Sequence, residues 1–332
     1  MLNLTPTYSL ADISIIPCEL TDIESRKECN CMCESLEGTR ETLPIVVAPM
    51  SCNYIGLQDA DIYASEGINV VIPRTVAFEE RLKTCKTYMT AFSLKEAESI
   101  LEYQFASGDW PEKIFMCIDM ANGHMKKQVD VGNKLREKFG KSLVLMGGNI
   151  ANPKTIRHYK NFDYLRVGIG GGAACLTSTQ TATHYSMASL ISDIKKLQAL
   201  EGLRSPKIIA DGGISGYSDA IKCLALGADY VMMGRVFTKA ALHGEAIGSD
   251  VSYYGMSTKK AQKEMGGLGN KTSEGKNMII QKEYTLSGWV ENFTDYLRSA
   301  MSYTGSRTLS AFRNNTECRV MSPNSSYAVN NK

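Results

Sequence analysis

The sequence predicts an α/β protein in which eight parallel strands and their helices form one (β/α)8 TIM barrel. Three observations lead to this fold class. Short apolar runs alternate with amphipathic helical stretches, eight runs can be counted, and the glycine-rich loops follow the later runs. The 332 residues accommodate a barrel of about 250 residues with additional segments.

The eight apolar runs are the predicted strands. Each is rich in Val, Ile, Leu, Met or Tyr and has the length of a buried parallel strand. They cover residues 45–48, 69–72, 89–92, 114–118, 143–146, 164–167, 207–210 and 230–233.

Amphipathic helices are predicted between the strands, for example over 94–104, 125–139, 186–200 and 218–226. In the last, apolar side chains recur at helical spacing, and Gly227 suits the position just after the helix. A doubly wound sheet is the alternative fold, but it usually carries its glycine fingerprint after the first strand. Beyond about Glu245 we expect a long excursion that acts as a flap over 248–285, a helix over 289–303 and a frayed tail over 321–332.

Composition excludes several classes of protein. Apolar residues make up 43% and charged residues 22%, which is typical of a folded chain. A net charge of +2 indicates no nucleic-acid partner, and no apolar run reaches the roughly 20 residues that span a membrane. The first residues lack the pattern of a secretory signal, so we expect a cytoplasmic protein with ten reduced cysteines. The Cys29-x-Cys31-x-Cys33 cluster has no second pair that would complete a zinc site.

The residues after each barrel strand form the expected catalytic face. Unusual groups follow the last five predicted strands: Asp119-Met-Ala-Asn122-Gly123-His124, Gly147-Gly148-Asn149, the loop from Gly168 to Thr177, Asp211-Gly212-Gly213 and Gly234-Arg235.

The loop from Gly168 to Thr177 is the most informative of these. Its glycines let the backbone approach a ligand or ion closely, and Cys175 could serve as a nucleophile. Taken alone, a tight turn with an inert cysteine explains the loop equally well. Asp211 suits ribose hydroxyls, and Arg235 suits a phosphate, although ordinary turns are the alternative. His124 and His184 are more simply structural, and no serine- or metallohydrolase pattern occurs.

Taken together, the blocks resemble the IMP dehydrogenase/GMP reductase family, and its GMP reductase branch more closely. The resemblance covers Tyr8 to Val320, and the blocks keep the order and spacing of the family. They are LPIVVAPM, DMANGH, GIGGGAACLT, IIADGG, GADYVMMGR, YYGMS and SEGK. It implies a TIM barrel in a homotetramer.

Two features favour the reductase branch. The chain has no room for the regulatory insertion usual in IMP dehydrogenases, so one catalytic domain over 1–332 is expected. Residues 256–275 contain neither Arg nor Tyr, the pair that activates water in IMP dehydrogenases. The resemblance therefore implies NADPH-dependent reductive deamination of a guanine nucleotide with release of ammonia. The alternatives are an NAD-dependent IMP dehydrogenase with a reduced flap, a catalytically weak nucleotide-binding paralogue and a flavin-dependent barrel.

The resemblance also implies roles for individual residues. Cys175 would attack purine C2, and Thr177 with Glu274 would protonate the departing amine. Asp119, Asn122 and Gly123 would lie near the nicotinamide. Backbone carbonyls of Gly170, Gly172 and Cys175 would hold a monovalent cation such as K+. The remaining residues would bind the nucleotide: Asp211, Gly212, Gly213, Gly234, Arg235, Gly255, Met256, Ser257, Lys271, Ser273 and Gly275.

The chain departs from the family pattern around the nucleotide. Ala173 stands where the family has a phosphate-binding serine, Ser178 replaces an arginine, and Arg235 replaces the second glycine of the phosphate turn. Lys271 stands in place of an arginine that contacts the base. We therefore hypothesise that the chemistry is retained and that the substrate is GMP or a deoxy- or base-modified analogue.

Overall fold

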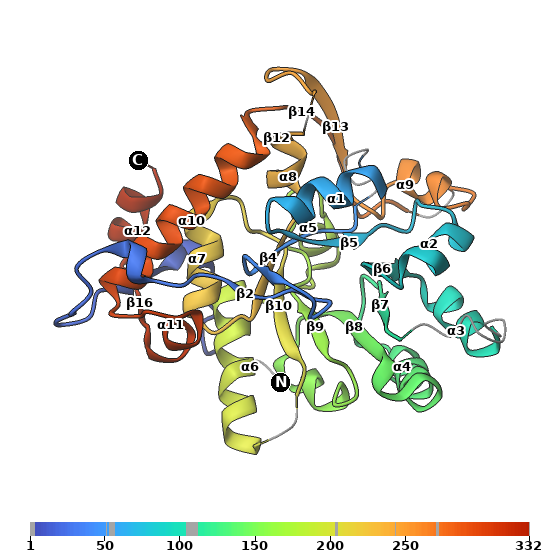
Figure 1. Cartoon of the computed structure of the whole chain (residues 1–332), viewed down its shortest axis with the longest axis horizontal. Helices are drawn as coiled ribbons and strands as arrows, with labels where there is room; N and C mark the ends of the chain where they lie inside the picture. Colours follow the sequence, from blue (N-terminus) through green and yellow to red (C-terminus); the bar gives the residue numbers. More distant parts are fainter. Residues whose placement is uncertain are drawn as a thin grey trace.

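A computed structural model describes residues 4–50, 52, 57–103, 112–202, 205–242, 244–269 and 272–331. At its centre, eight parallel strands close into a barrel (Figure 1). In order around the barrel they are β4 (Ile45–Val47), β5 (Asn69–Ile72), β6 (Met89–Phe92), β7 (Ile114–Ile118), β8 (Leu143–Ile150), β9 (Tyr164–Val167), β10 (Lys207–Asp211) and β11 (Tyr230–Met233). The ring closes where Val231 of β11 pairs with Ile45 of β4. The predicted fold class is confirmed.

Helices connect successive barrel strands and cover their outer surface. They are α1 (Leu57–Ser65), α2 (Phe78–Thr84), α3 (Leu94–Glu102), α4 (Lys126–Phe139), α5 (Thr177–Thr181), α6 (Met187–Glu201), α7 (Tyr217–Ala225) and α8 (Arg235–Lys239), with 3-10 turns η3 (Gly140–Ser142) and η4 (Pro153–His158). The four helices predicted by range are present with ends shifted by one or two residues, and residue 104 lies outside the described residues. Gly227 follows α7 with φ of +104°, as its position predicts.

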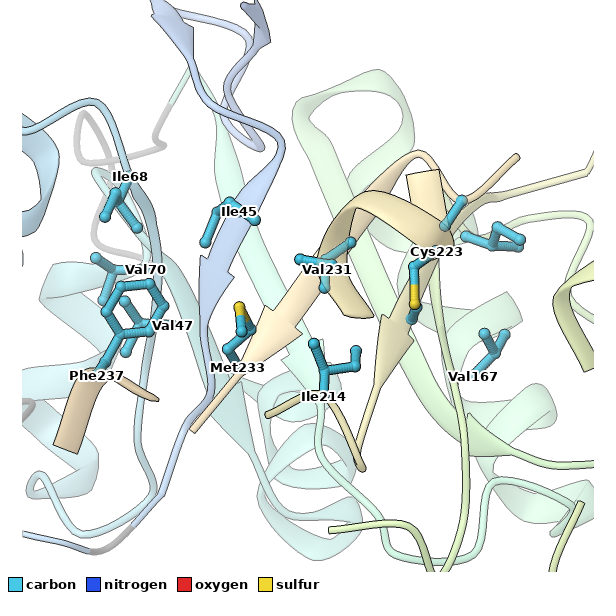
Figure 2. Close-up of a cluster of buried hydrophobic side chains, with 14 of the residues drawn as sticks. Ile45, Val47, Ile68, Val70, Val167, Ile214, Cys223, Val231, Met233 and Phe237 are labelled. Atoms are coloured by element: carbon cyan, nitrogen blue, oxygen red, sulfur yellow. The ribbon is translucent and has the colours of Figure 1, made fainter. Parts of the chain in front are cut away.

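Alternate residues of the barrel strands face opposite sides. Ile45 and Val47 of β4 point outward to the helices, where Phe237 also packs (Figure 2). Val46 instead belongs to a separate cluster that contains Met89 and Ile209 from other strands. Leu36 belongs to this cluster and its carbonyl accepts a hydrogen bond from Tyr164 at 3.2 Å. The barrel is thus a packed core, and its functional groups lie at the carboxyl ends of the strands.

The excursion that we expected over 248–285 contains a two-stranded ribbon. Strand β13 (Asp250–Tyr254) pairs antiparallel with β14 (Asn277–Gln281), and α9 (Lys259–Glu264) lies between them in sequence. Figure 1 shows this ribbon projecting beyond the barrel. Next, β15 (Tyr284–Thr285) pairs with β12 (Ala240–Ala241) and leads into α10 (Leu286–Tyr303).

The two ends of the chain pack together. Strand β1 (Ile13–Ile16) pairs antiparallel with β16 (Glu317–Val320), next to α11 (Leu309–Asn315) and the 3-10 turns η1 (Leu10–Asp12) and η2 (Arg26–Glu28). A short pair, β2 (Cys33–Glu34) with β3 (Glu41–Thr42), precedes the barrel.

The prediction of a frayed tail over 321–332 is wrong. Residues Pro323–Asn330 form the helix α12, whose first turn is capped by the Ser322 hydroxyl and begins with a proline. Ser326 Oγ and Asn330 Nδ2 both donate to the carbonyl of Ala11, at 2.7 and 2.9 Å. The tail is therefore held by contacts more than 310 residues away in sequence, which its polar composition could not indicate.

Within the described ranges, no helix is long and apolar enough to cross a membrane.

Candidate active site

The glycine-rich loop after β9 packs against the turn that follows β10. Gly168 has φ of +130°, and a Cβ there would lie 2.1 Å from the carbonyl oxygen of Asp211. A Cβ on Gly171 would lie 3.2 Å from the Gly212 backbone. Larger residues would push the two loops apart, so these glycines hold the Cys175 loop against the Asp211 turn.

Cys175, Thr177 and Glu274 form a chain of polar contacts. The Cys175 thiol donates to Thr177 Oγ1 at 3.3 Å, and the Thr177 hydroxyl donates to Glu274 Oε2 at 2.7 Å. All three side chains are partly buried, so they remain within reach of a ligand. The three residues that were predicted as a catalytic set are therefore brought together.

Backbone contacts attach the flap segment to the Cys175 loop. Leu176 N donates to Glu274 O at 2.6 Å, and Lys276 N donates to Ala174 O at 3.0 Å. A single β-bridge joins Cys175 to Gly275. Main-chain bonds at Glu274 and Lys276 thus hold this segment against the Cys175 loop, and the Thr177 hydroxyl orients the Glu274 carboxylate.

Other predicted nucleotide residues of the flap lie beside the same loop. A Cβ on Gly255 would lie 2.7 Å from Ala174 O, and a Cβ on Gly275 would lie 3.1 Å from Ser257 Oγ. Ser273 Oγ donates to the Gly275 carbonyl at 2.7 Å. Met256 lies between Gly255 and Ser257, whereas Lys271 falls outside the described residues.

The predicted phosphate side is formed by the turns after β10 and β11. Arg235 is exposed at the first position of α8, and Gly234 precedes it. A Cβ on Gly234 would lie 3.5 Å from the hydroxyl of Tyr253. Burial raises the pKa of Tyr253, so this hydroxyl stays protonated and can donate a hydrogen bond. Tyr253 belongs to the YYGMS block, but we assigned it no role from the sequence.

A network of ion pairs runs beneath the site. Arg166 contacts Asp119 at 2.6 Å and Asp211 at 2.9 Å, and Arg74 lies 3.0 Å from the second oxygen of Asp119. Burial tends to raise the pKa of Asp119, but Arg166 and Arg74 outweigh it and hold the pKa below its usual value. The Asp119 carboxylate is therefore ionised, and Arg166 orients both carboxylates.

Asn149 completes this network. Its Nδ2 donates to Asp211 Oδ2 at 2.8 Å and to the Gly168 carbonyl at 3.0 Å, which fixes the amide. The residue is 9% exposed, and its Oδ1 has no hydrogen-bond partner among the described residues. A buried amide oxygen without a partner is costly, so it favours a ligand that donates a hydrogen bond.

Sequence reasoning did not identify Arg74 or Arg166, and it placed Asn149 on the catalytic face without giving it a role. For Arg166 there was a signal, because an arginine inside a short, otherwise apolar strand must find buried partners. For Asn149, the preceding Gly147-Gly148 pair indicated a loop, but it did not predict where the Asn149 side chain points.

The loop after β7 is held against the end of β8. Gly123 N donates to Asn149 O at 2.7 Å, which places the predicted Asp119–Gly123 segment beside Asn149. Asn122 is exposed. His124 Nε2 accepts from Ala151 N at 3.0 Å, and partial burial lowers its pKa, which agrees with a structural role.

The two glycine carbonyls predicted to bind a cation have partners within the protein. Gly170 O accepts from Ser178 Oγ at 2.8 Å, and Gly172 O accepts from Cys175 N at 2.9 Å. In the part of the chain that the structure describes, no group of three or more His, Cys, Asp or Glu side chains could hold a metal ion.

Comparisons with known proteins agree with this geometry. Residues 113–328 match the family model described as IMP dehydrogenase / GMP reductase domain. A GMP reductase of Streptococcus pyogenes serotype M1 is 28% identical over 334 residues, which cover 94% of this chain and 95% of that protein. A GMP reductase of Onchocerca volvulus is 30% identical over 229 residues, 64% of this chain and 61% of that protein.

Proposed function

The chain belongs to the IMP dehydrogenase/GMP reductase family, and we propose that it reductively deaminates a guanine nucleotide with NADPH. The balanced reaction is guanine nucleotide + NADPH + 2 H+ → inosine nucleotide + NADP+ + NH4+. The observation that carries this proposal is the chain of contacts from Cys175 through Thr177 to Glu274. It combines a nucleophile with a proton source, and both are needed to remove an amine from an aromatic ring.

In the proposed first step, the Cys175 thiol passes its proton through the Thr177 hydroxyl to the Glu274 carboxylate, in the direction of the two hydrogen bonds, and the sulfur adds to purine C2. The exocyclic amine must take up a proton before the C2–N bond breaks and ammonia leaves. The Glu274 carboxyl supplies this proton through the Thr177 hydroxyl, which lies between the carboxyl and the sulfur. The base is then joined to Cys175 as a thioimidate.

A bound nicotinamide cofactor would supply a hydride to C2, after which the C2–S bond breaks and Cys175 is released. The described residues fit such a group. Among the described residues the buried Asn149 Oδ1 has no hydrogen-bond partner, so it suits the amino group of a carboxamide, and the Asn149 main chain is hydrogen-bonded to Met120 and Gly123 of the loop that follows β7. We assign the nicotinamide to this side of the Cys175 loop.

The nucleotide would lie across the loops after β10 and β11. All the hydrogen bonds to the Asp211 carboxylate from described residues fall on Oδ2, so Oδ1 can accept from ribose hydroxyls. Gly213, Arg235 and Tyr253 would hold the phosphate. Ala173 supplies no hydroxyl, and the Arg235 guanidinium compensates with a charge-assisted contact. The nucleotide is GMP or a deoxy- or base-modified analogue of it.

The proposal includes four expectations for the whole protein. The chain acts as one catalytic unit with its flap, it works as a homotetramer, its compartment is the cytoplasm, and a cation such as K+ supports the Cys175 loop when the carbonyls of Gly170, Gly172 and Cys175 turn toward it.

The test is a panel of GMP, dGMP and base-modified guanylates with NADPH, in which ammonia release and the loss of NADPH absorbance are measured together. We expect both signals in equal amounts and none with the Cys175→Ala variant. Turnover of IMP with NAD would instead support the dehydrogenase alternative. If no guanylate in the panel releases ammonia, the proposed function is wrong.

A further inference from the structure

A buried lysine lies outside the proposed catalytic site. Lys222 in α7 is 7% exposed, and its ammonium donates to the carbonyl of Leu10 at 2.9 Å. None of the ion pairs found among the described residues includes Lys222, although lysines are rarely buried without a charged partner. An ammonium has three donors, so this group can bind an anion in addition to the Leu10 carbonyl.

Lys222 lines a cleft of about 660 Å³ between β1, the start of α7, α10 and α12. Figure 1 shows α7, α10 and α12 on the same side of the barrel. This volume is within the range of small-molecule sites. Apolar side chains of Ile15 and Val329 and the hydroxyl-bearing Ser218 contribute to its wall. The cleft is formed partly by α12, the helix that replaces the expected frayed tail.

Two aromatic rings form one part of the wall. Tyr217 and Tyr296 are 5.1 Å apart, and Tyr217 stacks on Trp289 at 5.4 Å, which fixes its plane. Tyr296 is 50% exposed, so much of its ring is open to a ligand. Flat bases stack on such rings.

The other charged residue of the cleft wall, Asp219, accepts hydrogen bonds from Ser215. The Asp219 carboxylate accepts from Ser215 N at 2.9 Å and from Ser215 Oγ at 2.7 Å, at the start of α7. Neither charged residue of the cleft forms an ion pair among the described residues, but the Asp219 carboxylate is engaged by Ser215, whereas Lys222 has only the Leu10 carbonyl as an acceptor. The remaining Lys222 donors and the aromatic wall suit an anion with a flat ring.

We propose that this cleft is a second ligand site that binds a nucleoside 5′-phosphate. The phosphate pairs with Lys222, and the base lies against Tyr217 and Tyr296. Ser215 follows the Gly212-Gly213 turn by two residues, so the cleft adjoins the loop that borders the Cys175 site. The inference does not depend on which reaction the Cys175 site catalyses, because binding is measured without turnover.

The experiment is calorimetric titration of AMP into the full chain and five single-residue variants of it. AMP lacks the guanine amino group that the proposed reaction removes. We expect the wild type to bind AMP, and Lys222→Met and Tyr296→Ala to bind it at least tenfold more weakly. Lys196→Met serves as a matched control, because Lys196 is 70% exposed on α6, and it should bind AMP as the wild type does.

The proposal would be overturned if the wild type did not bind AMP at millimolar concentration, if both cleft variants bound AMP with wild-type affinity, or if inorganic phosphate bound as tightly as AMP. Loss of AMP binding in Arg235→Met alone would also overturn it, because AMP would then occupy the Cys175 site. Thermal melting checks that each variant is folded, and Lys222→Arg should retain AMP binding through its charge.

Discussion

Thr177 donates a hydrogen bond to Glu274 at 2.7 Å although 97 residues separate them in sequence. The hydroxyl comes from the first residue of α5, and the carboxylate comes from the flap segment, which main-chain bonds attach to the Cys175 loop. A proton held by the flap can therefore reach a ligand bound at Cys175 without passing through water.

Glu274→Gln should abolish most turnover and leave nucleotide binding intact. The amide keeps the size and can still accept from Thr177, but it cannot give up a proton. We expect kcat to fall by about 10²- to 10⁴-fold, the usual contribution of a general acid. Steady-state kinetics and equilibrium binding of the nucleotide measure the two effects. Glu291→Gln, an exposed position on α10, is the control, and near-normal turnover of Glu274→Gln would refute the acid role.

Arg235→Met should weaken nucleotide binding more than it slows the chemistry. Loss of one charge-assisted hydrogen bond costs about 1.5–3 kcal/mol, which corresponds to roughly a 10- to 150-fold rise in KM. Guanosine, which has no phosphate, should bind equally to both proteins. Arg319→Met is a suitable control because Arg319 is 71% exposed on β16. A KM unchanged by Arg235→Met would remove Arg235 from the phosphate site.

Asp119→Asn should destabilise the protein at pH 7 by about 3–5 kcal/mol, because it leaves Arg166 and Arg74 without their shared carboxylate. The pKa of Asp119 is lower in the folded protein than in the unfolded chain, where it is near ~3.9. The ionised carboxylate therefore adds to the free energy of unfolding above the unfolded pKa, and this contribution is lost as the pH falls through the folded pKa. Urea unfolding should therefore show the difference between wild type and variant shrinking below about pH 4.

Asp295→Asn is the comparison for this effect. Asp295 pairs with Arg26 at 2.8 Å, but its side chain is 42% exposed, so its loss should cost about 1 kcal/mol or less. Equal losses in the two variants at pH 7 would mean that the buried network contributes no more than a surface pair.

Ala182→Gly should stabilise the fold. Ala182, just after α5, has φ of +56°, a left-handed conformation that costs a residue with a Cβ about 1–2 kcal/mol. Glycine avoids this strain but is more flexible when unfolded, so the net gain should be about 1 kcal/mol or less. Ala199→Gly, at an exposed position within α6, should instead cost about 0.5–1 kcal/mol. Thermal unfolding of the two variants shows whether each substitution raises or lowers the stability of the fold. Destabilisation by Ala182→Gly would contradict the prediction.

The barrel could be predicted well from the sequence because each of its strands is marked by a short apolar run of its own. A strand buried on both faces must be continuously apolar, and five of the eight predicted ranges coincide with the observed strands. The strand 143–146 is the largest deviation. It continues to Ile150 through Gly147 and Gly148, residues that normally indicate a turn.

The site was less predictable because its parts meet only in the folded chain. The family blocks led to Cys175, Thr177 and Glu274, but the direction of the Asn149 amide depends on Asp211 and Gly168, which no local pattern reveals. The helix at the end of the chain was missed for the same reason, since its anchor is the carbonyl of Ala11.

The ion pairs beneath the site connect the carboxyl ends of four barrel strands. Arg74 follows β5, Asp119 follows β7, Arg166 lies in β9 and Asp211 ends β10, and their charges alternate in sign and sum to zero. A row of ion pairs with no net charge therefore crosses the carboxyl end of the barrel. It holds these four strands together without adding charge to the site. A change at Arg74 would remove one of the two cations that Asp119 contacts, so its effect would reach Arg166 and Asp211 through their shared ion pairs.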